Sequence, residues 1–409
     1  MTRKSAPVVS TYPAPRPTVA LSAHLLSLSA TYRSAGINRY IYGLLTHLPL
    51  AAPDMDYLGY VADAQIAAAQ PAGLRLAYTR WPTQNRAGRI AWEQTAQPLD
   101  LWERGIGLVH GLAYALPMVA AARSVVTVHD LTVFLFPAAF NHLNRLYIST
   151  ITRLSVQRAN AVIADSESTR NDLIRLLGAP AHKVAAIPLG VDAWLSAPRP
   201  KDIAAFRQRR GLPDHFILSL GTLEPRKNLD GLLRAYALLR RRAPDTPPLM
   251  LAGGAGWGFQ PLFQLVEQLG LSSHVSFPGY VPQDELPLWY AAADVFVYPS
   301  LYEGFGLPPL EALACGAAVV SSSSSSLPEV VGDAGLLVAP TDHAALADTL
   351  DRVLADPSLR DDLRQRGIAR AAGFTWQRTA EMTASLYRDV LAGRPIGAAR
   401  PPSPTGQAA

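Results

Sequence analysis

Two neighbouring cations, Arg226 and Lys227, stand where an apolar run of residues ends and a helical pattern begins. The run 218–220 leads into Gly221, which allows a tight exit from a strand, and the helical pattern continues to Arg241. Two cations beside the free amides of a helix N-terminus suit a diphosphate, because arginine grips phosphate as a fork and lysine acts as a point charge. The spacing alone also fits a solvated loop with ordinary basic residues.

Two carboxylates, Glu303 and Glu311, flank a glycine-containing turn after another apolar run, 295–298. Prolines are tolerated only in the first turn of a helix, so Pro308 predicts a helix start that leaves Glu303 in the loop and Glu311 early in the helix. Gly304 and Gly306 permit close approach of the backbone to a ligand. The carboxylates would accept hydrogen bonds from ribose hydroxyls, or they are a surface acid and an acid that favours the helix dipole.

Weaker candidates surround these two segments. The serine run 321–326 is either a linker or a loop that offers hydroxyls to a polar ligand, and its place after an apolar run favours the loop. Gly36 opens a helical pattern whose N-terminus would face a cleft. His129 ends a strand and would exchange a hydrogen bond with a substrate hydroxyl, or it is structural. Arg33 and Arg39 are further anion contacts or solvated cations.

The elements that position these residues alternate between short apolar runs and helix-length segments. This alternation predicts parallel βα units, and the nearly continuous apolar runs indicate sheets covered by helices on both faces. Ligand-binding loops in such sheets follow the carboxyl ends of the strands. The expected strands are 18–21, 57–61, 74–78, 108–110, 125–128, 161–164 and 184–187, then 216–220, 249–252, 275–277, 295–298, 318–321 and 336–338.

A proline-containing break near 193–212 divides the chain into two α/β halves with a cleft between them. The helix expected at 141–158 carries Leu143, Leu146 and Leu154 beside arginines. A core-facing helix with a solvated side is favoured, and a basic amphipathic helix that touches a membrane is the alternative.

The composition narrows the class of protein. The 409 residues are 49% hydrophobic and 17% charged, which excludes a largely disordered chain. A net charge of +5 with no long basic run argues against nucleic acid as a partner. The single cysteine, Cys315, excludes an internal disulfide and a cysteine-based zinc site, and it reads as a buried core thiol. No apolar run is long enough for a transmembrane helix or a signal peptide, which predicts a cytoplasmic protein.

Taken together, these segments resemble the retaining glycosyltransferases of the GT4 type (glycosyl transferases group 1), which have the GT-B fold. The resemblance covers about residues 18–392. Its most specific part is the E-x7-E pattern from Glu303 to Glu311 inside YEGFGLPPLEALACG, and GTLEPRKNL, VHDL, IPLGVD and SSLPEVVGDAG accompany it in the family's order. Phe374-Thr-Trp would open a last helix that crosses back onto the N-terminal domain.

The resemblance implies an organisation of the chain as well as a fold. It consists of a flexible tail (1–17), an acceptor domain (18–195), a donor domain (196–375), the crossing helix (376–392) and a second flexible tail (393–409). Both domains would be Rossmann-like and face a cleft.

The resemblance also implies roles for the matching residues. Arg226 and Lys227 would bind the donor diphosphate and stabilise the charge that builds on the leaving phosphate. The catalytic set would include Glu303 and His129 beside the donor sugar, and Glu311 would hold the ribose. Many relatives have arginine at the position of Thr222, so the cationic role of that position either falls on Arg226 or is absent here. The other implied donor contacts are Gly36, Gly221, Gly304, Phe305, Gly306, Leu307, Ser325 and Ser326, with Glu329 in the stretch that lines the nucleotide pocket.

The implied activity is transfer of a hexose, with mannose slightly favoured, from GDP-mannose or a UDP-sugar to a glycan or lipid-linked acceptor. It would need neither a cofactor nor a metal ion, because the cations take the metal's role. A role in cell-surface polysaccharide synthesis, with peripheral contact to the inner face of the plasma membrane, fits the family's usual territory. The alternatives are a non-hydrolysing sugar-nucleotide epimerase and a catalytically silent sugar-nucleotide binder.

Overall fold

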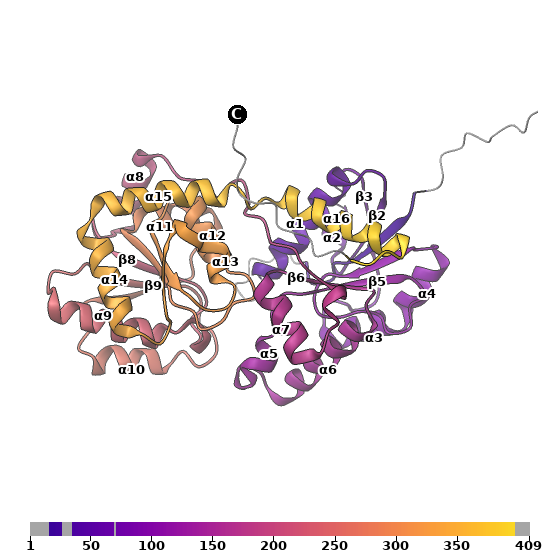
Figure 1. Cartoon of the computed structure of the whole chain (residues 1–409), viewed down its shortest axis with the longest axis horizontal. Coiled ribbons are helices and arrows are strands. Elements are labelled where there is room, and N and C mark those ends of the chain that lie inside the picture. The colour runs from indigo at the N-terminus through magenta and orange to yellow at the C-terminus, as the bar shows by residue number, and fades with distance from the viewer. Residues whose placement is uncertain (1–15, 27–34, 69–70, 397–409) are drawn as a thin grey trace, which may run out of the picture.

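Two parallel β-sheets, one in each half of the chain, form the framework of the protein (Figure 1). The computed structural model describes residues 16–26, 35–68 and 71–396. In the first sheet the order is β3-β2-β1-β4-β5-β6-β7, and all neighbouring strands are parallel. Its strands are β1 (Thr18–Ser22), β2 (Asp56–Val61), β3 (Leu74–Tyr78), β4 (Leu108–Gly111), β5 (Arg123–Val128), β6 (Ala161–Ala164) and β7 (Val184–Ala186).

The second sheet repeats this topology in the order β10-β9-β8-β11-β12-β13, again with parallel neighbours. In both sheets the order reverses beside the first strand of that half, so each sheet has a switch point where ligands of such folds bind. The strands are β8 (Ile217–Leu220), β9 (Leu249–Ala252), β10 (Val275–Gly279), β11 (Val295–Tyr298), β12 (Val319–Ser322) and β13 (Leu336–Val338).

Helices cover both faces of each sheet, as the continuous apolar strands require. α7 shows why the local sequence folds so: Ser166 caps its N-terminus by accepting a hydrogen bond from Thr169 N, and Gly178 ends it in the left-handed conformation. The helices of the first half are α1 (Ala35–Ala51), α2 (Ala64–Ala68), α3 (Arg86–Gln94), α4 (Ala96–Glu103), α5 (Thr132–Leu135), α6 (His142–Arg158) and α7 (Glu167–Leu177).

In the second half, α9, α10 and α14 cover one face of the sheet, and α11, α12 and α13 pack against the other. Cys315 follows α12 and is buried in this core, as predicted. The helices are α8 (Pro200–Arg210), α9 (Leu229–Arg242), α10 (Pro261–Gln268), α11 (Leu286–Ala292), α12 (Leu307–Ala314), α13 (Leu327–Val331), α14 (His343–Ala355), α15 (Pro357–Ala371) and α16 (Trp376–Ala392).

The last helix, α16, crosses back to the first half and packs along α1, which confirms the prediction (Figure 1). Two chain crossings lie side by side at this point, since Val191 N donates to Phe374 O at 3.0 Å and Trp376 Nε1 donates to Asp192 Oδ1 at 2.7 Å. The Trp376 ring lies so close to Gly43 of α1 that a Cβ there would be 2.4 Å from it. The crossings therefore form one packed connection between the halves.

Within the predicted break near 193–212, the chain is irregular up to Arg199, and α8 then begins at Pro200. The structure corrects one sequence-based expectation. α6 does not use its leucines for the core: Leu143, Leu146 and Leu154 are exposed, whereas Ile151 and neighbouring small residues are buried. Arg33 and most of both tails lie outside the described residues, and the ends of the two domains stay predictions. No helix in the described part of the chain is long and apolar enough to cross a membrane.

Candidate active site

A cleft of about 1770 Å³ lies between the two sheets. Loops that follow the first strands of each sheet reach it, as expected for a pair of switch points. Most of the residues that the sequence singled out line its wall: Gly36, His129, Gly221, Thr222, Arg226, Lys227, Glu303, Gly304, Phe305, Gly306, Leu307 and Glu311. Ser325, Ser326 and Glu329 do not line it.

Glu303 gathers the two cations at the base of the cleft. Arg226 donates to Glu303 Oε2 at 2.7 Å, and Lys227 Nζ donates to Glu303 Oε1 at 2.6 Å. The cations lie in a 3-10 turn, Pro225–Lys227, that precedes α9 rather than in the helix itself. Tyr298 and Ser300 also donate to Glu303, at 3.0 and 2.7 Å, so the carboxylate is fully engaged.

The charged groups of this cluster shift one another's pKa values. Burial on its own raises the pKa of Glu303, but Arg226 and Lys227 outweigh burial and lower it to about 2. The pKa of Arg226 is raised, because Glu303 and Glu224 offset its burial. Burial and the neighbouring Arg226 lower the pKa of Lys227. A carboxylate that stays ionised keeps two cations in place at the cleft.

Arg226 and Lys227 each have one N–H group that their hydrogen bonds to the described residues do not use. Arg226 gives its Nε and Nη2 to Glu224, and its Nη1 donates to Tyr302 O and Glu303. A guanidinium has five N–H groups and an ammonium has three. Among the described residues these bonds use four donors of Arg226, and Lys227 uses two on Glu303 and Tyr298. One donor of each cation is left for an anion in the cleft.

The serine run supports the Glu303 loop from behind. Ser325 Oγ accepts a hydrogen bond from Glu303 N at 2.8 Å, and Ser326 Oγ donates to Glu303 O and Phe305 O at 3.0 and 2.6 Å. Ser326 is fully buried and also lies at the N-terminus of α13. The run is thus a packed loop rather than a linker, and its last two hydroxyls position the loop. Donor contact by Ser325 and Ser326 stays a prediction.

The same loop touches the first half of the protein directly. Gly304 O accepts hydrogen bonds from Ser166 Oγ at 2.6 Å and Thr169 Oγ1 at 3.0 Å, both at the start of α7. A Cβ on Gly304 would lie 1.9 Å from His129 O, so only glycine fits this approach. Across the cleft, Gly36 of α1 lies against Leu307. These contacts make both sheets contribute to one site.

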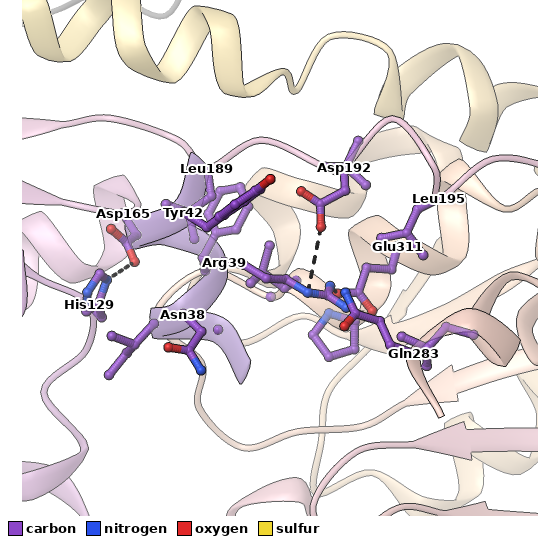
Figure 2. Close-up of a pocket in the computed structure, with 18 of the residues that line it drawn as sticks. Asn38, Arg39, Tyr42, His129, Asp165, Leu189, Asp192, Leu195, Gln283 and Glu311 are labelled. Carbon is purple, nitrogen blue, oxygen red and sulfur yellow. Dashed lines mark hydrogen bonds and ion pairs between the residues drawn. The ribbon is translucent and has the colours of Figure 1, made fainter. Parts of the chain in front are cut away.

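Glu311 is held by a residue from the opposite half. Arg39 of α1 forms an ion pair with its carboxylate and lies 3.8 Å from Asp192, and Tyr290 donates to it at 2.9 Å. Figure 2 shows Arg39 reaching between Asp192 and Glu311. Glu311 is buried. The ion pair with Arg39 joins the two halves at this carboxylate, which the sequence did not foresee because the two residues are far apart in the chain.

His129 lies at the cleft with both ring nitrogens engaged (Figure 2). Nδ1 contacts Asp165 Oδ2 at 2.8 Å, and Nε2 contacts Leu112 O at 2.9 Å. The Leu112 carbonyl can only accept a hydrogen bond, so Nε2 donates. Burial on its own lowers the pKa of His129, but Asp165 outweighs burial and raises it. His129 therefore presents no free ring nitrogen to the cleft.

Sequence reasoning missed several residues of the cleft. Asp165 directly follows β6, and its Oδ1 has no hydrogen-bond partner among the described residues. Gly253 and Gly254 follow β9, and a Cβ on Gly253 would lie 1.9 Å from Gly221 O. The glycine pair after an apolar run was the available signal for that loop. Among the described residues, no cluster of three His, Cys, Asp or Glu side chains could hold a metal ion.

Two family models match the chain: Glycosyltransferase Family 4 over residues 34–195 and Glycosyl transferases group 1 over residues 201–370. The O-antigen chain mannosyltransferase B of Escherichia coli is 35% identical over 370 residues, which are 87% of this chain and 97% of that protein. The sucrose-phosphate synthase of Thermosynechococcus elongatus superposes with a TM-score of 0.71 at 24% identity, over 93% of this chain and 100% of that one. HepE of Anabaena, solved in complex with UDP, has a TM-score of 0.68 at 21% identity, over 91% and 100%.

The two sheets, the cleft and the crossing helix define a GT-B fold, and the predicted fold class is confirmed. The chain belongs to the group 1 glycosyltransferases of the GT4 family. It is a hexosyltransferase, and the family acts on nucleotide sugars without a metal ion or another cofactor.

Proposed function

We propose that this enzyme transfers mannose from GDP-mannose to a growing cell-surface glycan, with retention of the anomeric configuration. The observation that carries the proposal is the buried cation pair, Arg226 and Lys227, held at the cleft by Glu303. The choice of mannose draws on the similarity to an O-antigen mannosyltransferase along nearly the whole chain. That HepE was solved with UDP keeps a UDP-sugar as the competing donor.

The chemistry follows from the charges. When the sugar leaves the nucleoside diphosphate, negative charge builds on the β-phosphate, and cations in a partly dry cleft stabilise it strongly. The remaining donors of Arg226 and Lys227 would bind phosphate oxygens, while Glu303 keeps both side chains ordered. Charged groups that are already positioned cost no reorganisation during the reaction.

Glu311 and His129 complete the proposed donor site. The ribose hydroxyls of the donor would take over Glu311 Oε1, which Arg39 now occupies. The freed Arg39 would stay near Asp192, which is already 3.8 Å away. The His129 ring would face the donor sugar from the first half, with Asp165 holding its orientation.

A nucleotide screen tests the donor. A ligand that binds the native protein raises its unfolding midpoint by mass action. At a ligand concentration of 100 times Kd, the free energy of unfolding rises by about 2.7 kcal/mol. We expect GDP and GDP-mannose to raise the midpoint more than UDP, ADP or their sugars. Mannose transfer from GDP-mannose to α-mannobiose would then be followed by mass spectrometry. An unchanged midpoint with every nucleotide would contradict the proposal. A larger rise with UDP than with GDP would indicate a UDP-sugar as the donor in place of GDP-mannose.

We also infer a cytoplasmic site of action with peripheral contact to an anionic membrane. The exposed Leu143, Leu146 and Leu154 on α6 support this inference, because they lie beside the exposed Arg145 and Arg153. Such a surface suits an interfacial helix. In a flotation assay the protein should bind vesicles that contain phosphatidylglycerol, and Leu143→Ser with Leu146→Ser should reduce binding at least fivefold. Equal binding by that variant would refute the contact.

A further inference from the structure

A second cavity, of about 240 Å³, lies in the first half of the protein beside the large cleft. It opens at the carboxyl ends of β1 and β4, and α3 and α6 supply its other walls. Ile37 and Tyr114 line both this cavity and the cleft. The Tyr114 ring also contacts the His129 ring at 5.7 Å between centroids. A molecule in this cavity would therefore lie next to the proposed point of transfer.

His24 lines this cavity with an unusual lack of partners. It is only 5% exposed, yet neither Nδ1 nor Nε2 has a hydrogen-bond partner among the described residues. The Trp92 ring contacts it edge-on at 4.6 Å between centroids, and Tyr60 stacks at 6.2 Å. Burial lowers the pKa of His24 to about 3, so the ring is neutral, with one donor and one acceptor. Buried polar atoms are normally paired, so these two require a partner.

Glu93, on α3, adds a second unpaired atom to the same cavity. Its Oε2 has no hydrogen-bond partner among the described residues, and its Oε1 lies 3.7 Å from Arg89 Nε. Burial raises the pKa of Glu93 to about 7. Arg86, the other cation of the wall, already bonds Asn144 and lies over the Tyr147 ring at 4.5 Å. The unpaired atoms in the cavity are thus one donor and one acceptor of His24 and one carboxyl oxygen of Glu93, while Arg86 and Arg89 each have a partner.

The unpaired polar atoms of His24 and Glu93 indicate which kind of ligand the cavity would bind. Hydroxyl groups both donate and accept hydrogen bonds, so they match a neutral imidazole and a carboxyl group that lacks a partner. An anion would meet the Glu93 oxygen, which repels it. Tyr147, Ile148 and Ile151 offer an apolar wall to the C–H face of a sugar ring. The volume lies just below the roughly 300 Å³ at which pockets for drug-sized molecules begin, so it suits one ring.

We propose that this cavity, with His24 and Glu93, binds a sugar ring of the acceptor and thereby directs the acceptor's end into the cleft. The inference rests on the proposed glycosyl transfer, since it gives that reaction its second substrate site. His24 and Glu93 would be positioning residues, because neither touches the donor side of the cleft. The acceptor chain would pass between Ile37 and Tyr114 to reach the donor sugar.

Binding of uncharged disaccharides tests the site directly. Saturation-transfer NMR would use α-mannobiose, maltose and lactose with the full chain in saturating GDP, which fills the nucleotide part of the donor site. We expect at least one disaccharide to bind the wild type, and His24→Phe and Glu93→Gln each to weaken it at least tenfold. The matched controls His142→Phe and Glu267→Gln change exposed residues and should bind as the wild type does.

The outcomes separate this inference from the proposed function. The acceptor site would be refuted if none of the three disaccharides binds, or if both variants bind as tightly as the wild type does. Loss of the disaccharide signal on addition of inorganic phosphate would overturn it in favour of an anion site. GDP should raise the unfolding midpoint of both variants as much as that of the wild type, which also shows that they fold. A failure of all nucleotides to bind would instead refute the proposed function.

A kinetic readout distinguishes positioning from a merely structural role. With the disaccharide that binds, His24→Phe should raise the acceptor KM at least tenfold and leave the KM for GDP-mannose unchanged. A general loss of structure would change both constants. Equal KM values for the acceptor in variant and wild type would count against the site.

Discussion

At the scale of single residues, the site depends on a balance of buried charge. Glu303 contacts both Arg226 and Lys227 within 2.7 Å, and its own position is set by Tyr298, Ser300 and the loop backbone. A buried carboxylate of this kind serves the cations, since two unpaired cations in a dry site would repel each other. The same arrangement explains why Glu303 is ill suited to general base catalysis: its pKa is held near 2.

Removal of the cations should abolish transfer. Arg226→Ala combined with Lys227→Ala takes away the positive charge that we propose to stabilise the leaving phosphate. Loss of such a contact typically costs at least about 10²-fold in rate. The fold should survive, because an unpaired Glu303 can take up a proton. Steady-state transfer from GDP-mannose measures the effect, with Arg234→Ala on the exposed face of α9 as the control. Turnover like that of the wild type in the double variant would reject these residues as the phosphate site.

The lowered pKa of Glu303 predicts a specific dependence of stability on pH. The ordinary pKa of 4.5 in the unfolded chain falls to about 2 in the folded protein, so the ionised group stabilises the fold above pH 4.5. That stabilisation is lost as the pH falls from 4.5 towards 2. The free energy of unfolding of Glu303→Gln should therefore approach that of the wild type in acid. The gap should shrink by about 2 kcal/mol between pH 6 and pH 3.

Urea denaturation followed by tryptophan fluorescence measures this gap. Glu267→Gln, at an exposed position on α10, serves as the control and should follow the wild type at every pH. A constant gap between Glu303→Gln and the wild type would show that Glu303 titrates normally in the folded protein.

At the scale of elements, the loops between strands and helices carry the residues of the site. The sequence predicted some of these features and missed others. The strands were readable because both faces are buried, so each is a short apolar run, and 295–298 is the same in prediction and structure. Glycine and proline marked the loop before α12. The ion pair between Arg39 and Glu311 was not readable, because 272 residues separate the partners and no local pattern joins them. Likewise, the exposure of Leu143 depends on how α6 packs, which its amphipathic spacing does not specify.

The Gly304 loop offers a test at this scale. A Cβ there would meet His129 O at 1.9 Å, so Gly304→Ala must displace the loop and break its bonds to Ser166 and Thr169. We expect kcat/KM to fall at least tenfold, which corresponds to about 1.4 kcal/mol. Gly107→Ala is the control, because its Cβ would make only ordinary contacts of 3.5 Å or more. Full activity in Gly304→Ala would show that this approach is not needed for transfer.

At the scale of the whole molecule, the two halves are held together by few polar contacts besides the crossings. Glu329 of α13 accepts hydrogen bonds from Glu167 N and Ser168 N at 2.8 and 2.7 Å, which caps α7 from the other half. The resemblance implies that Glu329 lies in the stretch that lines the nucleotide pocket, which stays a prediction, and in the structure its carboxylate forms this cap. Together with Arg39–Glu311 and Ser166–Gly304, it joins the two halves across the cleft. Closure of two such halves gates many enzymes.

Loss of the Glu329 cap should open the molecule. Glu329→Ala removes two hydrogen bonds to a charged acceptor, and each such bond contributes about 1.5–3 kcal/mol. The two N–H groups of α7 would then bond to water. Even 1.4 kcal/mol shifts an open–closed equilibrium tenfold, so the radius of gyration from small-angle X-ray scattering should rise above that of the wild type. Saturating GDP-mannose should bring it back, because a donor that contacts both halves binds the closed form better. Glu267→Ala should scatter as the wild type does. A radius unchanged in Glu329→Ala would mean that the crossings at Val191 and Trp376 alone set the angle between the halves.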